Sequence, residues 1–69
     1  MTNTDVFFKI EGNIGKMCNI ILKDRVIIYK RILLGTKGDV YGDLFLIISE
    51  GKSERTISVT NIADIEIID

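Results

Sequence analysis

The sequence has no histidine, no proline, no tryptophan and a single cysteine, Cys18. Histidine is the side chain most often used in general acid–base catalysis, and a cysteine nucleophile needs a base beside it. One thiol cannot form an intrachain disulfide, and a zinc ion would find almost no protein ligands. We therefore expect a chain that is not an enzyme and carries no metal or cofactor, with Cys18 as a small buried hydrophobe.

Long apolar runs and targeting signals are missing as well. The longest aliphatic or aromatic run is Leu44–Ile48, whereas a transmembrane helix needs roughly 20 apolar residues. The chain does not open with a basic segment followed by an apolar one, so we see no secretory signal. Because an unpaired thiol suits a reducing compartment, we expect a soluble, cytoplasmic protein without a transmembrane segment.

Branched aliphatic residues are abundant instead. Ile, Leu and Val occur 14, 5 and 4 times and make up 23 of the 69 residues, whereas alanine occurs once. This composition argues against disorder. β-Branched side chains lose χ1 freedom on a helix and pack well on a pleated sheet, so the isoleucine excess favours strands. We predict a single all-β domain over residues 5–69, preceded by a loose N-terminus at residues 1–4.

Alternation of apolar and polar residues predicts about six short strands. They are expected at Asp5–Glu11, Ile14–Leu22, Val26–Leu34, Asp43–Ser49, Arg55–Thr60 and Ile62–Ile68. Short connections favour an antiparallel meander. Ile57 and Val59 should point inward on the fifth strand. Both faces of Val26–Leu34 and of Asp43–Ser49 are apolar, which predicts a curled sheet, a small barrel or a partner over the second face.

Strict alternation also assigns the two faces of the third strand. Val26, Ile28, Ile32 and Leu34 would share one face with Lys30, and Ile27, Tyr29 and Leu33 would share the other with Arg25 and Arg31. The strand follows a polar break at Lys23-Asp24-Arg25, where the Asp24 carboxylate can accept a hydrogen bond from the backbone that follows it. We therefore expect a hairpin centred on Asp24.

Glycines mark the other connections. Gly12-Asn13 tolerates positive φ and fits a tight turn, and Gly15 suggests a bulge or a close backbone approach. Gly35–Gly42 is the longest candidate loop, and Glu50–Ser53 fits a four-residue turn. A phosphate loop would need a helix after Gly35–Gly42. A strand pattern follows instead, so we interpret the segment as a hairpin loop.

Two stretches resemble strands of small PH-like and GRAM-like β domains. Arg25–Tyr29 is similar to their "drliiy" strand, and Thr56–Ile65 is similar to their strand pair with two spaced isoleucines. The resemblance implies a small barrel-like domain, although those families normally finish with a C-terminal helix and this sequence finishes in a strand pattern. Their basic lipid-headgroup signature is replaced here by Glu11-Gly12-Asn13. SH3-like and Sm-like barrels are equally compatible with the strand count.

Charge is unevenly distributed along the chain. Between positions 16 and 37 there are six basic residues and one acidic residue, whereas positions 38–69 hold two basic and seven acidic residues. Three interpretations remain open: neighbouring strands neutralise one another, one copy's basic edge meets another's acidic edge, or the basic segment binds an anion.

These observations predict a non-catalytic protein-interaction or assembly module, self-associating through strand edges or an exposed apolar face. The alternative is a small barrel that binds nucleic acid through Lys16, Lys23, Arg25, Lys30, Arg31 and Lys37. The candidate interaction residues are Lys23, Arg25, Tyr29, Lys30, Arg31, Lys37 and Tyr41.

Overall fold

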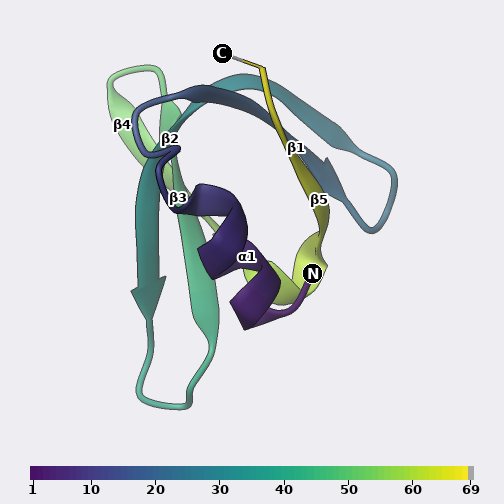
Figure 1. Cartoon of the computed structure of the whole chain (residues 1–69), viewed down its shortest axis with the longest axis vertical. Helices are drawn as coiled ribbons and strands as arrows, with labels where there is room; N and C mark the ends of the chain where they lie inside the picture. Colours follow the sequence, from purple (N-terminus) through teal and green to yellow (C-terminus); the bar gives the residue numbers. More distant parts are fainter. Residues whose placement is uncertain (69) are drawn as a thin grey trace.

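A short helix precedes five β-strands in the computed structural model, which describes residues 1–68 (Figure 1). The elements are α1 (Asn3–Ile10), β1 (Met17–Leu22), β2 (Ile27–Gly38), β3 (Leu44–Glu50), β4 (Ser53–Ser58), the 3-10 turn η1 (Val59–Asn61) and β5 (Ile62–Ile67). All strand pairs are antiparallel and form one sheet in the order β4-β3-β2-β1-β5. The sheet curls without closing, so the prediction of a small all-β domain is confirmed.

The strand order differs from a simple meander at the last step. β1 to β4 follow one another across the sheet, but β5 returns to the far side and pairs with β1, where Ile65 lies opposite Ile20. The turn η1 separates β4 from β5 and redirects the chain. As predicted, Ile57 and Val59 point inward, although Val59 lies in η1 rather than in a strand.

The predicted first strand at Asp5–Glu11 is wrong, because this segment is helical. Val6 and Ile10 are buried, and their spacing of four residues fits one face of a helix as well as it fits alternation. A capping box decides the outcome. The Asp5 N–H donates to Thr2 Oγ1 at 3.1 Å, and the Thr2 N–H donates to the Asp5 carboxylate at 3.0 Å. The hydrogen bond that the Thr2 N–H donates to the Asp5 carboxylate is the largest cause that lowers the pKa of Asp5, and hydrogen bonding by the Thr2 side chain is the next largest.

Residues 1–4 are held against the sheet, contrary to the expected loose terminus. The Met1 ammonium group donates to the Ile62 carbonyl oxygen at 2.7 Å, and the Thr2 carbonyl accepts the Val6 N–H at 3.1 Å. Asn3 already belongs to α1. The start of the helix is therefore fixed both to its own first turn and to the start of β5.

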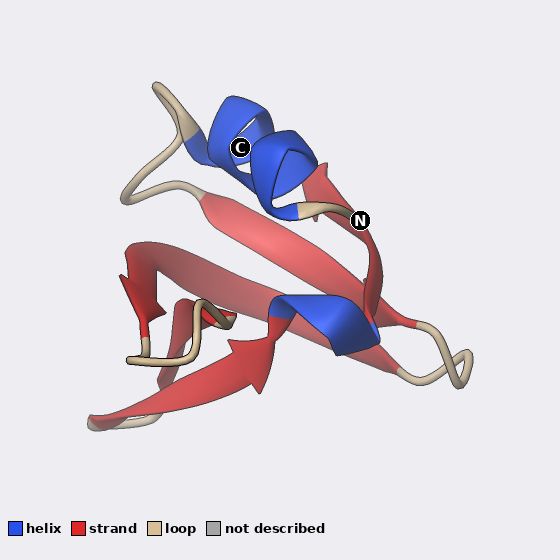
Figure 2. Ribbon diagram, turned by 90° about the horizontal axis from the view of Figure 1, so that it is seen from below, coloured by secondary structure: helices blue, strands red, loops and turns tan. Residues whose placement is uncertain are grey.

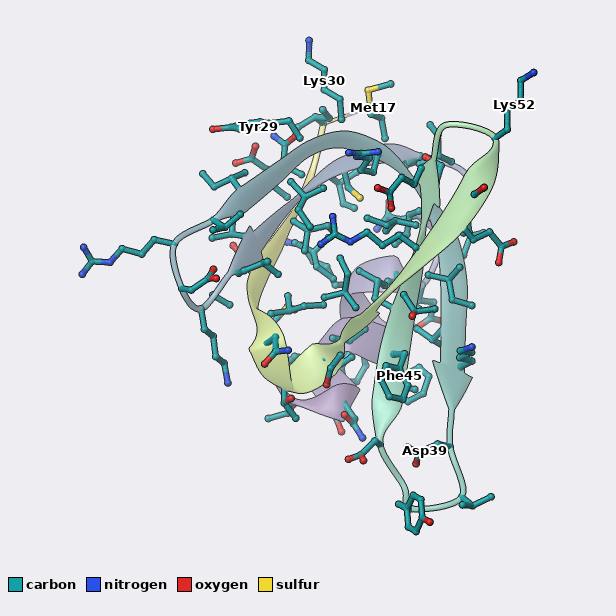
Figure 3. All side chains as sticks on the ribbon, turned by 180° about the vertical axis from the view of Figure 1, so that it is seen from behind. Met17, Tyr29, Lys30, Asp39, Phe45 and Lys52 are labelled. Atoms are coloured by element: carbon teal, nitrogen blue, oxygen red, sulfur yellow. The ribbon has the colours of Figure 1, made fainter. Side chains whose placement is uncertain are left out.

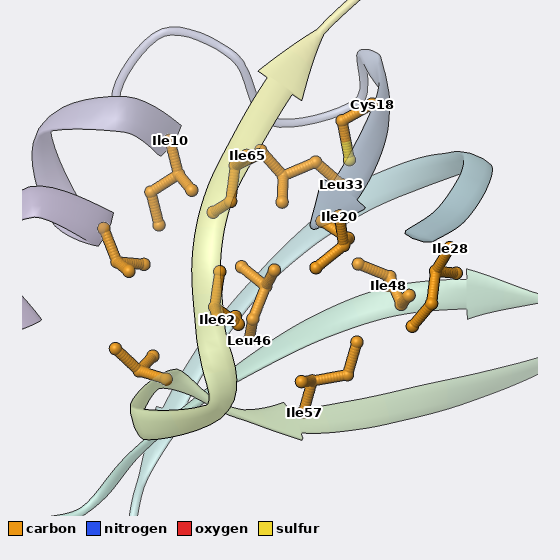
Figure 4. Packing of buried hydrophobic residues seen from close by; sticks show 12 residues of the cluster. Ile10, Cys18, Ile20, Ile28, Leu33, Leu46, Ile48, Ile57, Ile62 and Ile65 are labelled. Carbon is orange, nitrogen blue, oxygen red and sulfur yellow. The ribbon is translucent and has the colours of Figure 1, made fainter. Parts of the chain in front are cut away.

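The core lies inside the curl of the sheet, and α1 lies across one side of that curl (Figure 2). Side chains from α1, all five strands and η1 meet there (Figure 4). The buried residues are Val6, Ile10, Cys18, Ile20, Ile28, Leu33, Leu46, Ile48, Ile57, Val59, Ile62 and Ile65. Burying such aliphatic side chains is the main favourable term for a domain of this size. Within residues 1–68 none of the buried residues is polar or charged.

A bulge in the first half of β2 shifts its alternation. Ile28 pairs with Ile20, but Arg31 pairs with Cys18, so this part of β2 holds one residue more than the facing part of β1. Lys30, inside the bulge, has φ of 54°, a left-handed conformation that L residues seldom adopt. The predicted faces of the third strand are therefore wrong beyond Ile28.

A second bulge follows in the same strand. Leu33 pairs with Ile48 and Gly35 pairs with Ile47, which leaves Leu34 as the extra residue. Leu33 is fully buried whereas Leu34 is 39% exposed, the reverse of the face that alternation assigns with Ile28. The Ile32 N–H, displaced from the regular ladder, donates to Ser49 Oγ at 2.8 Å. Two bulges allow a single long strand to bend around the core.

The turns agree better with the sequence than the first strand does. Gly12 has φ of 75° in the turn that follows α1, and Asp24 Oδ1 accepts the Val26 N–H at 3.1 Å, as predicted for the β1–β2 hairpin. Gly51 has φ of 60° in the β3–β4 turn. The predicted Gly35–Gly42 loop is too long, because β2 continues to Gly38 and the turn begins after it.

Candidate functional site

The sheet ends in two edges, β4 and β5, that pair with no strand within residues 1–68. On β4 the free side can be derived from the ladder. The Leu33 N–H donates to the Lys16 carbonyl at 2.9 Å, and the Leu33 carbonyl accepts the Gly15 N–H at 2.8 Å, so both backbone groups of Leu33 point toward the β1 side. Backbone directions alternate along an antiparallel strand. Ile48, opposite Leu33, therefore faces β4, and Arg55, opposite Ile48, faces β3. Glu54 and Thr56 consequently direct their backbone groups to the free edge.

The β5 edge carries an internal cap. The Ile68 N–H donates to the Met17 carbonyl at 3.0 Å, so by the same alternation Ile65 and Ile67 direct their backbone groups away from β1. The Ile65 N–H donates instead to Oδ1 of its neighbour Asp64, at 2.8 Å. The two edges are therefore unlike: one N–H of β5 is already bonded to a carboxylate.

The edges also differ in charge. β5 carries Asp64 and Glu66 on the face away from the core, whereas the turn before β4 carries Lys52 and β4 itself carries Arg55 together with Glu54. β5 holds two acidic residues, whereas β4 and the turn before it together hold two basic residues and one acidic residue, so a contact between β4 and β5 brings fewer like charges together than a contact between two β5 edges. This agrees with the interpretation in which a basic edge of one copy meets an acidic edge of another. It excludes neither neutralisation between neighbouring strands nor binding of an anion.

Most of the exposed large apolar side chains lie in three places: on and after α1, around the β1–β2 hairpin and the first bulge, and at the tip of the β2–β3 hairpin. They are Phe7, Phe8 and Ile14 in the first place, Val26, Ile27 and Tyr29 in the second, and Val40 and Tyr41 in the third. Leu34 in the second bulge and Ile68 after β5 are exposed as well.

The tip of the β2–β3 hairpin is held by Asp39 (Figure 3). Asp39 Oδ1 accepts the Tyr41 N–H at 2.9 Å and the Asp43 N–H at 3.0 Å, and the Asp39 N–H donates to the Asp43 carbonyl at 3.0 Å. These bonds fix the loop while Val40 and Tyr41 stay 92% and 88% exposed. An apolar aliphatic and an aromatic side chain are thus presented to solvent on a braced support.

A surface depression of about 360 Å³ lies at the base of this hairpin and reaches β4. It is lined by Lys37, Gly38, Asp39, Phe45 and Thr56. Lys37 lies directly opposite Phe45 in the ladder, so a cation and an aromatic ring share one face of the sheet. The depression is shallow, yet it can accept a flat group beside a positive charge.

The structure does not bring the sequence-predicted interaction residues together. Lys23 and Arg25 lie in the β1–β2 turn, beside a second depression of about 320 Å³ lined by Leu22, Lys23, Asp24 and Asn61.

The other predicted residues lie elsewhere. Tyr29 and Lys30 form the first bulge, and Arg31 follows it and is half-buried opposite Cys18. Lys37 and Tyr41 belong to the β2–β3 hairpin; in Figure 3 its tip at Asp39 lies at the opposite end of the molecule from Tyr29 and Lys30. Three separate groups result, rather than one basic surface.

Sequence reasoning missed Phe45, Thr56 and Asp64. In the sequence Phe45 is only part of an apolar strand, and the pairing that sets it beside Lys37 depends on the second bulge. The cap on β5 was not foreseeable without the strand order. Asp64-Ile65 in an edge strand is the signal that would have suggested it, had β5 been assigned to an edge.

Three further observations concern Cys18, metal ligands and the helices. Burial raises the pKa of the Cys18 thiol, which suits a hydrophobe and not a nucleophile. Residues 1–68 contain no group of three or more Cys, Asp or Glu side chains arranged to hold a metal ion. No helix in this part of the chain is long and apolar enough to cross a membrane.

Comparison with known proteins gives no assignment. The chain matches no protein-family model, and neither the curated proteins nor the solved structures give a match.

Proposed function

We propose that this chain is a non-catalytic assembly module that binds further copies of itself through its strand edges. The observation that supports the proposal most strongly is the open sheet. Two edge strands pair with no other strand within residues 1–68, β4 directs the Glu54 and Thr56 backbone groups outward, and exposed edges are templates for strand addition. The sequence holds no proline to block either edge. Proteins usually avoid such edges unless they are used.

Pairing of β4 of one copy with β5 of another is the mode that the charges favour. The two surfaces differ, so the contact is heterologous, and repetition of it closes a ring or extends a filament. β4 offers backbone groups at Glu54 and Thr56, and on β5 Ile67 directs its backbone groups away from β1, whereas Ile65 is fully buried and its N–H is bonded to Asp64. Exposed apolar residues next to the edges, such as Ile68 at 42% exposure, add area to such a contact.

The proposal is tested by blocking the free side of β4. Thr56→Pro removes an N–H that faces away from β3, so the ladder inside the sheet is kept. We expect this variant to keep the far-ultraviolet circular dichroism of a β protein and to elute as a monomer. Thr56→Ala, which keeps the N–H, is the matched control and should elute like the unmodified chain. Light scattering after size exclusion supplies the masses, and equal masses for all three proteins would reject edge pairing through β4.

The type of small barrel and the compartment belong to the same proposal. The PH-like, SH3-like and Sm-like types that the sequence suggests are all small β folds, and a curled sheet of five antiparallel strands is in keeping with each of them. The single, buried thiol is compatible with a reducing compartment, and we place the protein in the cytoplasm on that ground.

A second candidate function is binding of single-stranded nucleic acid at the β2–β3 hairpin. Its support is the exposed Tyr41 on a braced loop, with Lys37 and Phe45 at the hairpin base. Aromatic rings stack on bases and cations contact phosphates, and each stacked base contributes about 1–3 kcal/mol. Oligonucleotide binding measured by fluorescence anisotropy should weaken with added salt and with Tyr41→Ala. Val40→Ala at the same tip is the control. Absence of binding at low salt would exclude this function.

A further inference from the structure

The free edge of β4 and the depression at the base of the β2–β3 hairpin meet at Thr56. Thr56 is exposed and directs its backbone N–H and carbonyl away from β3. The same residue lines the depression, together with Phe45 and Lys37. Backbone groups that accept a strand therefore lie next to a hollow that accepts a side chain, which is the arrangement that binds extended peptides by strand addition.

The strand pairing places the depression on the outer face of the sheet. Leu46 points into the core, so its neighbours Phe45 and Ile47 point outward. Ser58 and Thr56 lie opposite them on β4. Residues paired directly across antiparallel strands share a face, so the residue of an added strand that pairs with Thr56 directs its side chain to the face of the depression.

The lining of the depression selects the side chain that fits it. β3 lies two strand spacings, roughly 10 Å, from a strand added to β4, so only a long side chain reaches Phe45 across the small Thr56 and Ser58. An aromatic ring gains most there, because it packs against the Phe45 ring and presents its face to the Lys37 ammonium group. We propose that the β4 edge and the depression form one binding site for an extended segment of another protein that carries an aromatic side chain opposite Thr56.

A second copy of the chain does not supply this side chain, because no aromatic residue lies on an edge strand. The five aromatic residues lie in α1, in the first bulge, at the tip of the β2–β3 hairpin and in the depression itself: Phe7, Phe8, Tyr29, Tyr41 and Phe45. The inference rests on the free β4 edge of the proposed function and adds an occupant that competes with a second copy for the Thr56 N–H. Binding of this partner and assembly through β4 therefore exclude each other.

The probe is a capped heptapeptide of alternating threonine and valine whose central residue is phenylalanine. The same peptide with alanine at the centre is its control. Each is titrated onto isotope-labelled protein, diluted until it is monomeric, and the amide NMR shifts give the dissociation constants. We expect the phenylalanine peptide to bind about fivefold more tightly than the alanine peptide, with the Thr56 amide among the shifted signals. Thr56→Pro should bind neither peptide.

Three variants test the depression apart from the edge. Lys37→Ala removes an exposed cation and Phe45→Leu removes the ring, and each should reduce the preference for phenylalanine to about twofold or less. Lys52→Ala is the matched control for Lys37→Ala, because Lys52 lies in the β3–β4 turn, far from Phe45 in Figure 3. We expect it to keep the preference of about fivefold.

The outcomes separate this site from the proposed assembly. Equal affinity for the two peptides, or a preference that survives both in Lys37→Ala and in Phe45→Leu, would overturn the aromatic site. Absence of binding at millimolar peptide would overturn it as well, and if the same protein associates with itself in sedimentation, the assembly stands without it. If the phenylalanine peptide binds with the expected preference and the protein never associates, the assembly is wrong and the peptide site stands.

Discussion

Asn19 joins three strands through one side chain, and its replacement should lower stability by a predictable amount. Asn19 Oδ1 accepts the N–H of Lys30 at 2.9 Å, inside the first bulge of β2, and Asn19 Nδ2 donates to Glu66 Oε1 on β5 at 2.9 Å. Lys30 holds φ of 54°, a conformation that costs roughly 1–2 kcal/mol for a non-glycine residue. The amide of Asn19 therefore supports a strained bulge from one side and the edge strand from the other.

Asn19→Asp keeps the acceptor for Lys30 and removes the donor for Glu66. Loss of that hydrogen bond costs about 1 kcal/mol. Two carboxylates then lie about 4 Å apart in water, which adds about 1 kcal/mol of repulsion. The free energy of unfolding should fall by about 2 kcal/mol, and the melting temperature of a domain this small by about 8–16 °C.

Glu66→Gln supplies the control, because its amide can accept from Asn19 in the single variant and donate to the carboxylate that Asn19→Asp introduces in the double variant. We expect Glu66→Gln alone to change stability by less than about 0.5 kcal/mol and to restore about 1–1.5 kcal/mol to Asn19→Asp. Urea unfolding followed by circular dichroism measures all four proteins, provided they are compared in the same oligomeric state. No loss in Asn19→Asp, or no recovery in the double variant, would refute the bridging role of Asn19.

Three further predictions concern the core, the cap of α1 and the thiol. Leu46→Ala removes a fully buried side chain and should lower the free energy of unfolding by about 2–5 kcal/mol. The total free energy of unfolding for a chain of this length is about 3–10 kcal/mol. A loss below about 1 kcal/mol in urea unfolding would contradict the packing of Leu46 in the core. The pKa of Asp5 is lower in the folded state, so its contribution is present above the ordinary pKa and is lost as pH falls through the lowered one. Thermal melts at several pH values should show a smaller acid loss in Asp5→Asn than in the unmodified chain. Cys18 is buried with a raised pKa, so Ellman's reagent should react slowly with the folded protein at pH about 8 and rapidly in denaturant; fast reaction of the folded protein would place Cys18 at the surface.

The sequence predicted the fold class and most strands because side chains buried on a sheet alternate, and every predicted strand after the first lies close to an observed one. The Asp24 turn was also predictable, since its carboxylate acts on its own following backbone. The first strand failed because Val6 and Ile10 fit both periods. The deciding evidence, the Thr2 and Asp5 capping box, depends on two polar side chains outside the apolar pattern.

The strand order and the faces of the residues in β2 could not be predicted from the sequence, for a different reason. A bulge changes the face of every residue after it, and neither Lys30 nor Leu34 is a residue type that marks a bulge. The return of β5 to β1 depends on three-dimensional closure around the core and not on any local signal. The candidate site was predictable only where it depends on local sequence. Tyr41 was predicted from a local loop pattern, whereas Phe45, Thr56 and Asp64 acquire their positions only through strand pairing.

We propose that copies of this chain join through unlike edges of an open sheet. Sedimentation velocity of the unaltered protein, over a dilution series spanning the micromolar range, tests it most directly. We expect the weight-average sedimentation coefficient to rise with concentration beyond the value of one chain. A coefficient that stays at the monomer value throughout the series would contradict it.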